Sequence, residues 1–206
     1  MSGTTPGPSA HRYERAPGGI GPDDSLQRLA AWVAPGSTVL ELGPASGYFT
    51  RRLRDALGCT VDAVELDPAM AEQARPYCRR LVVGDLAQLD LDAALGGARY
   101  RVIVAADVIE HVAHAEPVLE QLKTLLAPGG MLLVSVPNVA YAGLVAALLE
   151  GRFEYRDEGL LDRSHLRFFT RDSLAALLAR CGLHAHDWAP VFRPLGFEDW
   201  RVTTAL

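Results

Sequence analysis

"LELGPASGYF", at residues 40–49, stands where an apolar run gives way to a helical pattern. The residues before the turn, TVLEL at 38–42, form a short β-rich run, and YFTRRLRDAL at 48–57 has apolar residues four apart, as an amphipathic helix requires. Gly43 and Gly47 lie in the turn between the two. Glycine at such a turn lets a helix N-terminus and a ligand approach the backbone closely. The stretch therefore indicates either a cofactor loop or an ordinary strand-to-helix turn.

The glycine spacing argues against a dinucleotide site. The pattern G-x-G-x-x-G, counted from Gly43, requires glycine at two positions that are occupied by Ala45 and Tyr48. What remains is E-x-G-x-A-x-G, which runs from Glu41 to Gly47. Alanine is the smallest side chain after glycine, so close approach survives if the backbone at Ala45 needs no positive φ. A nicotinamide site is therefore the weaker interpretation.

A rhythm of strands and helices runs through most of the chain. Apolar runs alternate with amphipathic patterns, and Pro68 falls at the start of one such pattern, where its missing N–H costs nothing. This rhythm predicts a parallel sheet with helices on both faces. We expect strands over 38–43, 60–67, 80–85, 100–109 and 131–138, and helices over 48–57, 68–77 and 116–126, the last of them stopped by APGG.

The pattern changes after the fifth predicted strand. Residues 139–150 are expected to form a helix, whereas 151–169 are irregular and mix aromatic and charged residues with a histidine. Thr170 at an N-cap position, with Ser173 three residues later, predicts a further helix, although the pair is a weak capping signal. One or two closing strands are expected in 183–206.

Acidic side chains end the second and third predicted strands. Glu65 stands in ELD, eighteen residues after Gly47, and Asp85 follows Gly84. Because a parallel sheet binds its ligand at the carboxyl ends of its strands, these acids are expected beside the glycine-containing turn. A carboxylate at the first position can accept two hydrogen bonds from a ribose diol, and the second can reach an adenine amino group. The three strand ends together predict a nucleoside site.

The composition is that of a globular protein. The 206 residues are 49% hydrophobic and 22% charged, and the net charge of −5 gives no electrostatic reason to expect a nucleic-acid partner. No apolar run reaches membrane-spanning length, and the N-terminus has no apolar core typical of a signal peptide. Three scattered cysteines fit free thiols in a reducing compartment, so a cytoplasmic location is predicted.

The chain is expected to hold one domain after a flexible N-terminal arm. The arm covers residues 1–24 and is rich in Gly, Pro, Ser and Thr, and the domain covers 25–206. Tyr13 and Arg15 lie in the arm, which either covers the cofactor cleft or forms a disordered tail.

The ordered set of these segments resembles the class I S-adenosylmethionine-dependent methyltransferases. VLELGPASGYFTRRL is similar to their first motif, E/D-x-G-x-G-x-G, and VDAVELDPAMAEQAR, VVGDL and YRVIVAADVIEHV are similar to the second, third and fourth. The order and spacing match over residues 38–138, and HLRFFT with the helix after it extends the resemblance to about 182. The resemblance implies an α/β fold of the Rossmann-like, doubly wound type, with a mostly parallel, seven-stranded sheet and helices on both faces.

The resemblance also implies S-adenosylmethionine as the cofactor and a role for each matching position. The implied cofactor-binding residues are Glu41, Gly43, Ala45 and Gly47 along the methionine part, Glu65 at the ribose hydroxyls, Leu66, Asp85 and Leu86 at the adenine, and Ala106 and Asp107 facing the cofactor and substrate. Ala45 departs from the family pattern, which has glycine there, and this departure bears on the geometry of the loop.

Two histidines are the candidate catalytic residues. His111 follows the fourth predicted strand and can act as a base, bind substrate, or pack at its turn and orient the loop. His165, in DRSHLRFFT, can contact the acceptor or close the rim of the site through a structural hydrogen bond. Arg167, on the same face as His165 of an extended chain, and Asn138, at the end of the fifth predicted strand, are the predicted substrate-binding residues. A metal-dependent mechanism would need clustered carboxylates, which Asp107 and Asp162 could supply if they met, but no metal site is predicted.

These observations predict an enzyme that transfers a methyl group from S-adenosylmethionine to an oxygen or nitrogen atom of a small-molecule acceptor. Residues 139–169 are expected to supply specificity as a substrate-binding insertion. Two alternatives stay open, a cofactor-binding but inactive scaffold domain and a nicotinamide oxidoreductase. Neither a nucleic acid nor a membrane is expected as a partner, and the sequence does not indicate the oligomeric state.

Overall fold

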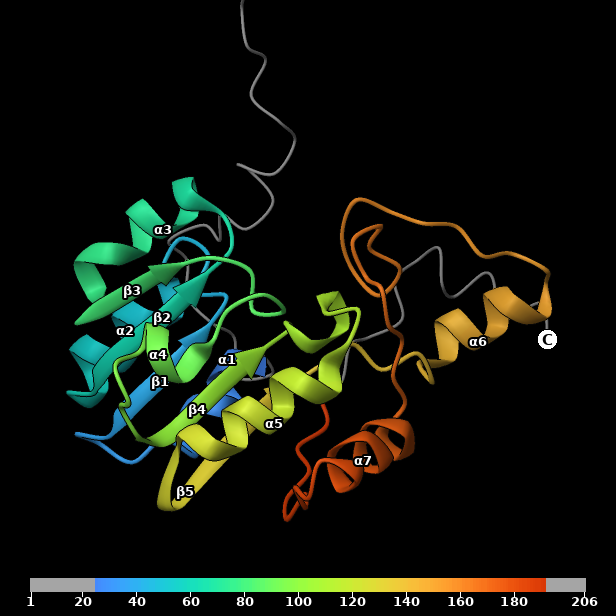
Figure 1. Cartoon of the computed structure of the whole chain (residues 1–206). Coiled ribbons are helices and arrows are strands. Elements are labelled where there is room, and N and C mark those ends of the chain that lie inside the picture. The colour runs from blue at the N-terminus through green and yellow to red at the C-terminus, as the bar shows by residue number, and fades with distance from the viewer. Residues whose placement is uncertain (1–24, 192–206) are drawn as a thin grey trace, which may run out of the picture.

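A parallel sheet with helices on both of its faces forms the body of the molecule (Figure 1). The computed structural model describes residues 25–191. Within them, the strands are β1 (Thr38–Leu42), β2 (Thr60–Glu65), β3 (Arg80–Val83), β4 (Tyr100–Ala106) and β5 (Leu126–Ser135). Their order across the sheet is β3-β2-β1-β4-β5, and every pair is parallel. Strand order therefore reverses between β1 and β4, which is where such sheets bind their ligands.

The helices connect the strands and cover the sheet. The α-helices of the described range are α1 (Ser25–Ala31), α2 (Tyr48–Leu57), α3 (Pro68–Ala74), α4 (Leu91–Ala94), α5 (Ala115–Leu125), α6 (Ala142–Leu149) and α7 (Arg171–Arg180). Two short 3-10 helices, η1 (Arg75–Tyr77) and η2 (Ile109–His111), follow α3 and β4. Figure 1 shows α6 and the loop after it standing to one side of the sheet, beyond the carboxyl end of β4.

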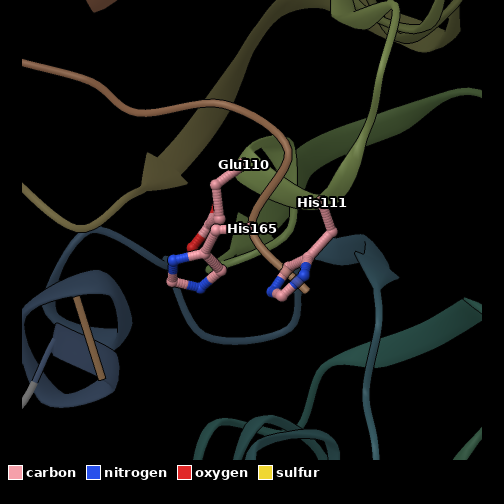
Figure 2. Close-up of side chains that lie close together, drawn as sticks. All are labelled: Glu110, His111 and His165. Atoms are coloured by element: carbon pink, nitrogen blue, oxygen red, sulfur yellow. The ribbon is translucent and has the colours of Figure 1, made fainter. Parts of the chain in front are cut away.

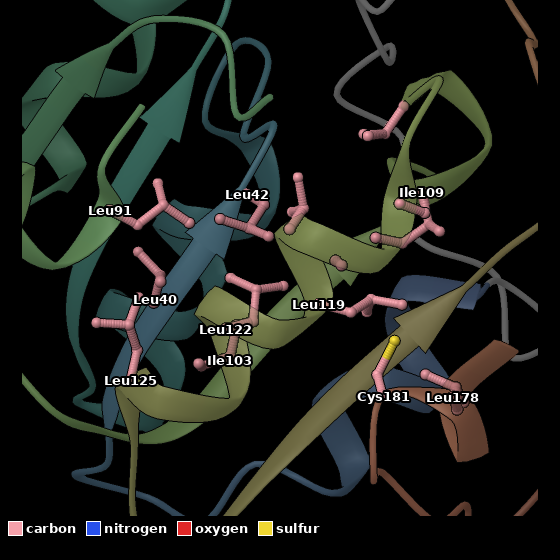
Figure 3. Packing of buried hydrophobic residues seen from close by; sticks show 14 of the residues in the cluster. Leu40, Leu42, Leu91, Ile103, Ile109, Leu119, Leu122, Leu125, Leu178 and Cys181 are labelled. Carbon is pink, nitrogen blue, oxygen red and sulfur yellow. The ribbon is translucent and has the colours of Figure 1, made fainter. Parts of the chain in front are cut away.

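The sheet is buried on both faces because its residues alternate between two hydrophobic clusters. Leu40 of β1 belongs to the cluster that α5 and α7 complete, whereas the adjacent Val39 belongs to the cluster that α1 and α2 complete. Figure 3 shows Leu119 and Leu122 of α5 among the strand residues of the first cluster. Burial on both faces explains why the strands appear in the sequence as nearly continuous apolar runs.

The two helix starts that were predicted from local signals, Pro68 and the Thr170 N-cap, are confirmed. Asp67 caps α3, its side chain accepting hydrogen bonds from the backbone N–H groups of Ala69 and Met70, and Pro68 is the first residue of the helix. Thr170 and Ser173 form a capping box at α7, in which each side chain accepts a hydrogen bond from the other residue's backbone N–H. This cap is stronger than the sequence indicated, because a reciprocal pair satisfies two free N–H groups of the first turn.

The prediction of a seven-stranded sheet is wrong for the part of the chain that the structure describes, which holds five strands. The closing strands were expected in 183–206, but residues 183–191 form no strand and 192–206 lie outside the described residues. The predicted N-terminal arm, with Tyr13 and Arg15, also lies outside them. No helix within residues 25–191 is long and apolar enough to cross a membrane.

The start of β5 differs from the expected one. APGG was expected as a turn that stops the preceding helix, but β5 begins at Leu126 and includes these residues. The pairing register of β4 with β5 shifts between Tyr100 and Val102. The pairing of the two strands is therefore irregular where β5 contains its glycines. Gly130 allows this, since a Cβ atom there would lie 2.8 Å from the carbonyl oxygen of Tyr100. The glycines mark a close approach of two strands rather than a turn.

Candidate functional site

The predicted cofactor-binding residues meet at one edge of the sheet. β1 pairs with β2 on one side and with β4 on the other, and parallel pairing brings the carboxyl ends of the strands to the same edge. Glu41 lies in β1 itself. The other predicted residues are Gly43, Ala45 and Gly47 in the loop after β1, Glu65 and Leu66 at the end of β2, Asp85 and Leu86 after β3, and Ala106 and Asp107 at the end of β4.

Glu65 joins two loops at this edge through its carboxylate. Its Oε2 accepts a hydrogen bond from the Ala45 N–H at 2.9 Å, and its Oε1 accepts one from the Asp67 N–H at 2.9 Å. The residue is 7% exposed, so little water competes for these bonds. A carboxylate oxygen accepts more than one hydrogen bond, which leaves Glu65 able to accept bonds from ribose hydroxyls as well.

Ala45 has a positive φ, which the sequence analysis left open. Its φ is 50°, in the left-handed region, where a Cβ atom costs about 1–2 kcal/mol. The condition under which alanine would replace glycine without strain is therefore not met. The hydrogen bond from Ala45 to Glu65 holds the residue in this conformation. Ala45 is thus held in a left-handed conformation with local strain.

Gly43 and Gly47 are required by packing within the chain itself. Gly47 has a φ of 81°, and a Cβ atom there would lie 2.7 Å from the Cα of Ala74 in α3. Gly43 has a φ of 62°, and a Cβ atom there would lie 3.0 Å from Cγ2 of Val108. An ordinary strand-to-helix turn with this packing would need both glycines, so they alone do not indicate a cofactor. The evidence for a cofactor loop rests more on Glu65.

Glu41 is buried beneath the loop. Burial raises the pKa of its carboxyl group from 4.5 to about 7; the adjacent Thr50 side chain opposes part of this rise, and the charge of Glu65 adds to it. No described residue forms a hydrogen bond with Oε2 of Glu41 or with the Thr50 hydroxyl. The folded protein therefore holds the proton of Glu41 to a higher pH than the unfolded chain, and both forms of the carboxyl group are populated near pH 7.

The carboxylates of the two remaining acids of the predicted cofactor site accept hydrogen bonds from within the chain. Asp85 is exposed, and its Oδ1 accepts a hydrogen bond from the Ala87 N–H at 2.8 Å. Asp107 has a φ of 54°, and its Oδ1 accepts a hydrogen bond from the Ser135 hydroxyl at 2.8 Å. The Asp107 N–H bonds to the backbone oxygen of Ser135 at 3.0 Å. Asp107 is thus a strained residue held across the ends of β4 and β5, as functional residues often are.

The two candidate catalytic histidines lie together (Figure 2). His111 ends η2 and His165 comes from the loop before α7, and their ring centroids are 4.8 Å apart at an angle of 73°. Nδ1 of His111 lies 3.2 Å from the carbonyl oxygen of Ser164, and Nδ1 of His165 lies 3.1 Å from that of Leu160. Burial, followed by the charge of His165, lowers the pKa of His111.

Glu110 is the residue of this cluster that the sequence analysis missed. It is 1% exposed, and no described residue bonds to either of its carboxylate oxygens. Burial, with a further contribution from the charge of Asp107, raises the pKa of Glu110 to about 8. Its backbone oxygen accepts hydrogen bonds from the N–H groups of Leu166 and Arg167, at 2.8 and 3.0 Å. These bonds hold the loop that carries His165 against η2.

The two predicted substrate-binding residues have partners within the chain. The Arg167 guanidinium donates to the carbonyl oxygen of Ala113 at 2.8 and 2.6 Å and lies 3.5 Å from Glu116, so it braces the loop before α5. Asn138 accepts a hydrogen bond from the Ala140 N–H at 3.0 Å and forms an isolated parallel bridge with Phe169. The bridge ties the start of the predicted insertion, 139–169, to its end.

Aromatic side chains gather beside His165 within that insertion. Phe168 has its ring centroid 6.4 Å from that of His165, and Phe153 and Tyr155 lie 6.2 and 6.5 Å from Phe168. Phe153 is 47% exposed and Tyr155 46%, so they form a partly open apolar wall. Such a wall next to polar groups is the usual composition of a small-molecule site.

Comparison with known proteins decides the family. A family model described as a methyltransferase domain matches residues 10–187. The chain belongs to this methyltransferase family. S-adenosylmethionine is therefore its cofactor, and the nicotinamide alternative is set aside.

Its relatives include O-methyltransferases. The ubiquinone biosynthesis O-methyltransferase of Xylella fastidiosa (strain 9a5c) is 27% identical over 83% of this chain and 69% of its own length. The malonyl-[acyl-carrier protein] O-methyltransferase of Serratia marcescens is 26% identical over 80% of this chain and 60% of its own. Among solved structures, magnesium protoporphyrin IX methyltransferase from Synechocystis PCC 6803 shares the fold, with a TM-score of 0.58 at 19% identity over 78% of this chain and 72% of that one.

The strain at Ala45 predicts the effect of restoring glycine. Ala45→Gly should raise the free energy of unfolding by about 0.5–1 kcal/mol, because glycine adopts positive φ without a Cβ clash. Chemical denaturation of both proteins measures the difference. Ala176→Gly, at an exposed position of α7, is the matched control and should lower stability by about 1 kcal/mol. A loss of stability in Ala45→Gly equal to that of the control would contradict the strain.

The buried Glu41 predicts a dependence of stability on pH. Its pKa is higher in the folded than in the unfolded chain, so the folded state holds the proton longer and stability falls as pH rises from about 4.5 to 7. Glu41→Gln removes this effect. From pH 5 to pH 8 the variant should gain about 2 kcal/mol relative to the unmodified protein.

Urea denaturation of the two proteins at several pH values measures this gain. The other titrating groups, including Glu110, are common to both proteins and cancel in the difference. A difference in stability that does not change with pH would refute the raised pKa of Glu41.

Proposed function

We propose that this methyltransferase transfers the methyl group of S-adenosylmethionine to a hydroxyl oxygen of a small-molecule acceptor. The observation that carries the proposal is the cluster of Glu110, His111 and His165 beside Asp107, at the carboxyl end of β4. Methyl transfer from a sulfonium is an in-line displacement, and a hydroxyl must lose its proton to become a good nucleophile. The cluster offers groups that can accept or displace that proton.

The cofactor side of the proposal rests on the loops that Glu65 joins. The Glu65 carboxylate keeps acceptor capacity for the ribose hydroxyls, and Asp85 lies beyond it at the next strand end. The buried Glu41 lies under the same loop and would become charged more readily beside a cationic cofactor. The three residues belong to β1 or follow β2 and β3, toward the carboxyl edge of the sheet.

The acceptor side rests on the 139–169 segment. Its aromatic side chains stand next to His165, which points to an acceptor with an apolar or aromatic body and a hydroxyl group. The named O-methyltransferases among the relatives support oxygen over nitrogen as the methylated atom. We assign to Arg167 and Asn138 the role of holding this segment in place, because both already bond within the chain.

An assay with S-adenosylmethionine carrying a radioactive methyl group tests the proposal. A panel of phenols, aliphatic alcohols, carboxylic acids and amines is offered to the enzyme, and label is expected in a hydroxyl-bearing compound. His165→Ala should lower turnover by about 10²–10⁴-fold without changing the affinity for S-adenosylhomocysteine. His184→Ala, at an exposed position, is the matched control and should leave turnover unchanged.

A second variant separates the cofactor site from the acceptor site. Glu65→Ala should weaken S-adenosylhomocysteine binding by about 1–3 kcal/mol in calorimetry, through loss of charge-assisted hydrogen bonds. Binding of the cofactor with no methyl transfer to any class of acceptor would contradict the proposed function and favour an inactive scaffold. Label found only in amines would contradict the assignment to oxygen.

A further inference from the structure

The carboxylate of Glu110 is a buried polar group that needs a partner. Both oxygens lack a hydrogen-bond partner among the described residues, and the residue is 1% exposed. A buried carboxylate without partners is unfavourable by several kcal/mol, so native proteins pair such groups with a proton, a donor or a cation. Glu110 therefore indicates a partner that the described residues do not supply.

The neighbouring histidines are oriented as metal ligands are. His111 and His165 each place Nδ1 beside a backbone carbonyl oxygen, that of Ser164 at 3.2 Å and that of Leu160 at 3.1 Å. A carbonyl only accepts hydrogen bonds, so each Nδ1 carries the proton and each Nε2 keeps its lone pair. This arrangement, in which a carbonyl fixes the ring through the nitrogen that does not bind metal, is the usual support of a metal-binding histidine.

The three side chains lie close together (Figure 2). Glu110 and His111 come from η2 and His165 from the loop that the Glu110 backbone oxygen anchors, and one ligand atom from each lies within 4.8 Å of the others. Atoms that share one zinc ion lie roughly 3–4 Å apart, because each is about 2 Å from the metal. Binding of an ion would therefore draw the three ligand atoms closer together.

We propose that Glu110, His111 and His165 bind a single divalent transition-metal ion of the zinc type. Two imidazoles and one carboxylate are one of the ligand sets found in catalytic zinc sites, which leave a further position open. Imidazole nitrogen favours zinc, iron, nickel and copper, whereas magnesium and calcium favour oxygen ligands. The sequence analysis expected no metal and did not consider Glu110 as a ligand.

The ion's role in the reaction rests on the function proposed above. The acceptor hydroxyl binds at the open position, and the ion lowers its pKa so that its proton leaves to water. The oxygen then forms a bond to the methyl carbon while the bond between that carbon and sulfur breaks. The electron pair stays on sulfur and yields S-adenosylhomocysteine. Charge balances, since the cationic cofactor and a neutral alcohol give two neutral products and one proton.

Zinc binding by the full chain tests the site directly. Zinc chloride is titrated into metal-stripped protein by calorimetry, and the zinc content after dialysis is measured by mass spectrometry. One ion per chain is expected for the unmodified protein. Glu110→Gln, His111→Ala and His165→Ala should each weaken zinc binding by at least about 10–100-fold. His114→Ala, at an exposed position three residues from His111, is the matched control and should bind as the unmodified protein does.

Two further measurements do not depend on enzyme activity. Cobalt binding tests the metal site by absorption, and cofactor binding checks that each variant is folded. Cobalt chloride should give a visible absorption typical of a four- or five-coordinate site, lost in Glu110→Gln, which changes no side-chain volume. S-adenosylhomocysteine affinity should be unchanged in each variant, which shows that the domain is folded.

The possible outcomes separate the two proposals. Zinc affinity that is the same in the unmodified protein and in all four variants would overturn the metal site, and so would the absence of any bound zinc. If methyl transfer still occurred in that case, the proposed function would stand and a proton would be the partner of Glu110. Zinc binding that depends on the three residues, without methyl transfer to any acceptor, would retain the metal site and reject the proposed function.

Discussion

The Glu65 carboxylate is the contact on which the cofactor side of the molecule depends. One oxygen holds the Ala45 N–H and the other the Asp67 N–H, so a single buried group sets the shape of the loops after β1 and β2. Its bond to Ala45 helps to maintain a left-handed residue that is not glycine. A group that fixes two loops before the cofactor arrives reduces the ordering that binding requires. In the proposed site, Glu65 therefore both binds the cofactor and holds the two loops in place before the cofactor binds.

A second constraint acts at the acceptor side, through the backbone of Glu110. Its carbonyl oxygen anchors Leu166 and Arg167, and so brings His165 from a distant part of the sequence to His111. Arg167 reinforces this position by donating to the carbonyl oxygen of Ala113. The polar cluster is thus built by the folding of the 139–169 segment onto the end of β4. The segment that we propose to confer specificity also completes the proposed site.

Apolar patterns in the sequence predicted the fold, because buried strands appear as short apolar runs and amphipathic helices as apolar residues spaced by about one turn. They also placed Glu65 correctly, since a strand end in a parallel sheet has a known location. The φ of Ala45 could not be predicted in this way, because it is held by a hydrogen bond to a residue 20 positions away. Glu110 was missed for a similar reason, as the loop that brings His165 beside it and bonds to its backbone oxygen comes from a distant part of the sequence. The glycines of β5 were assigned to a turn because close approach of strands leaves no local signal.

Hydrogen exchange of the full chain, with and without S-adenosylhomocysteine, tests the central claim most directly. The cofactor site described here predicts slower exchange at the backbone N–H groups of Ala45, Asp67 and Ala87, which are bonded to the acids at the carboxyl edge of the sheet. Binding there makes local opening of these loops rarer. The N–H groups within α7, which forms no part of this edge, should exchange at an unchanged rate. Unchanged exchange at Ala45 and Asp67 in protein saturated with S-adenosylhomocysteine would contradict the assignment.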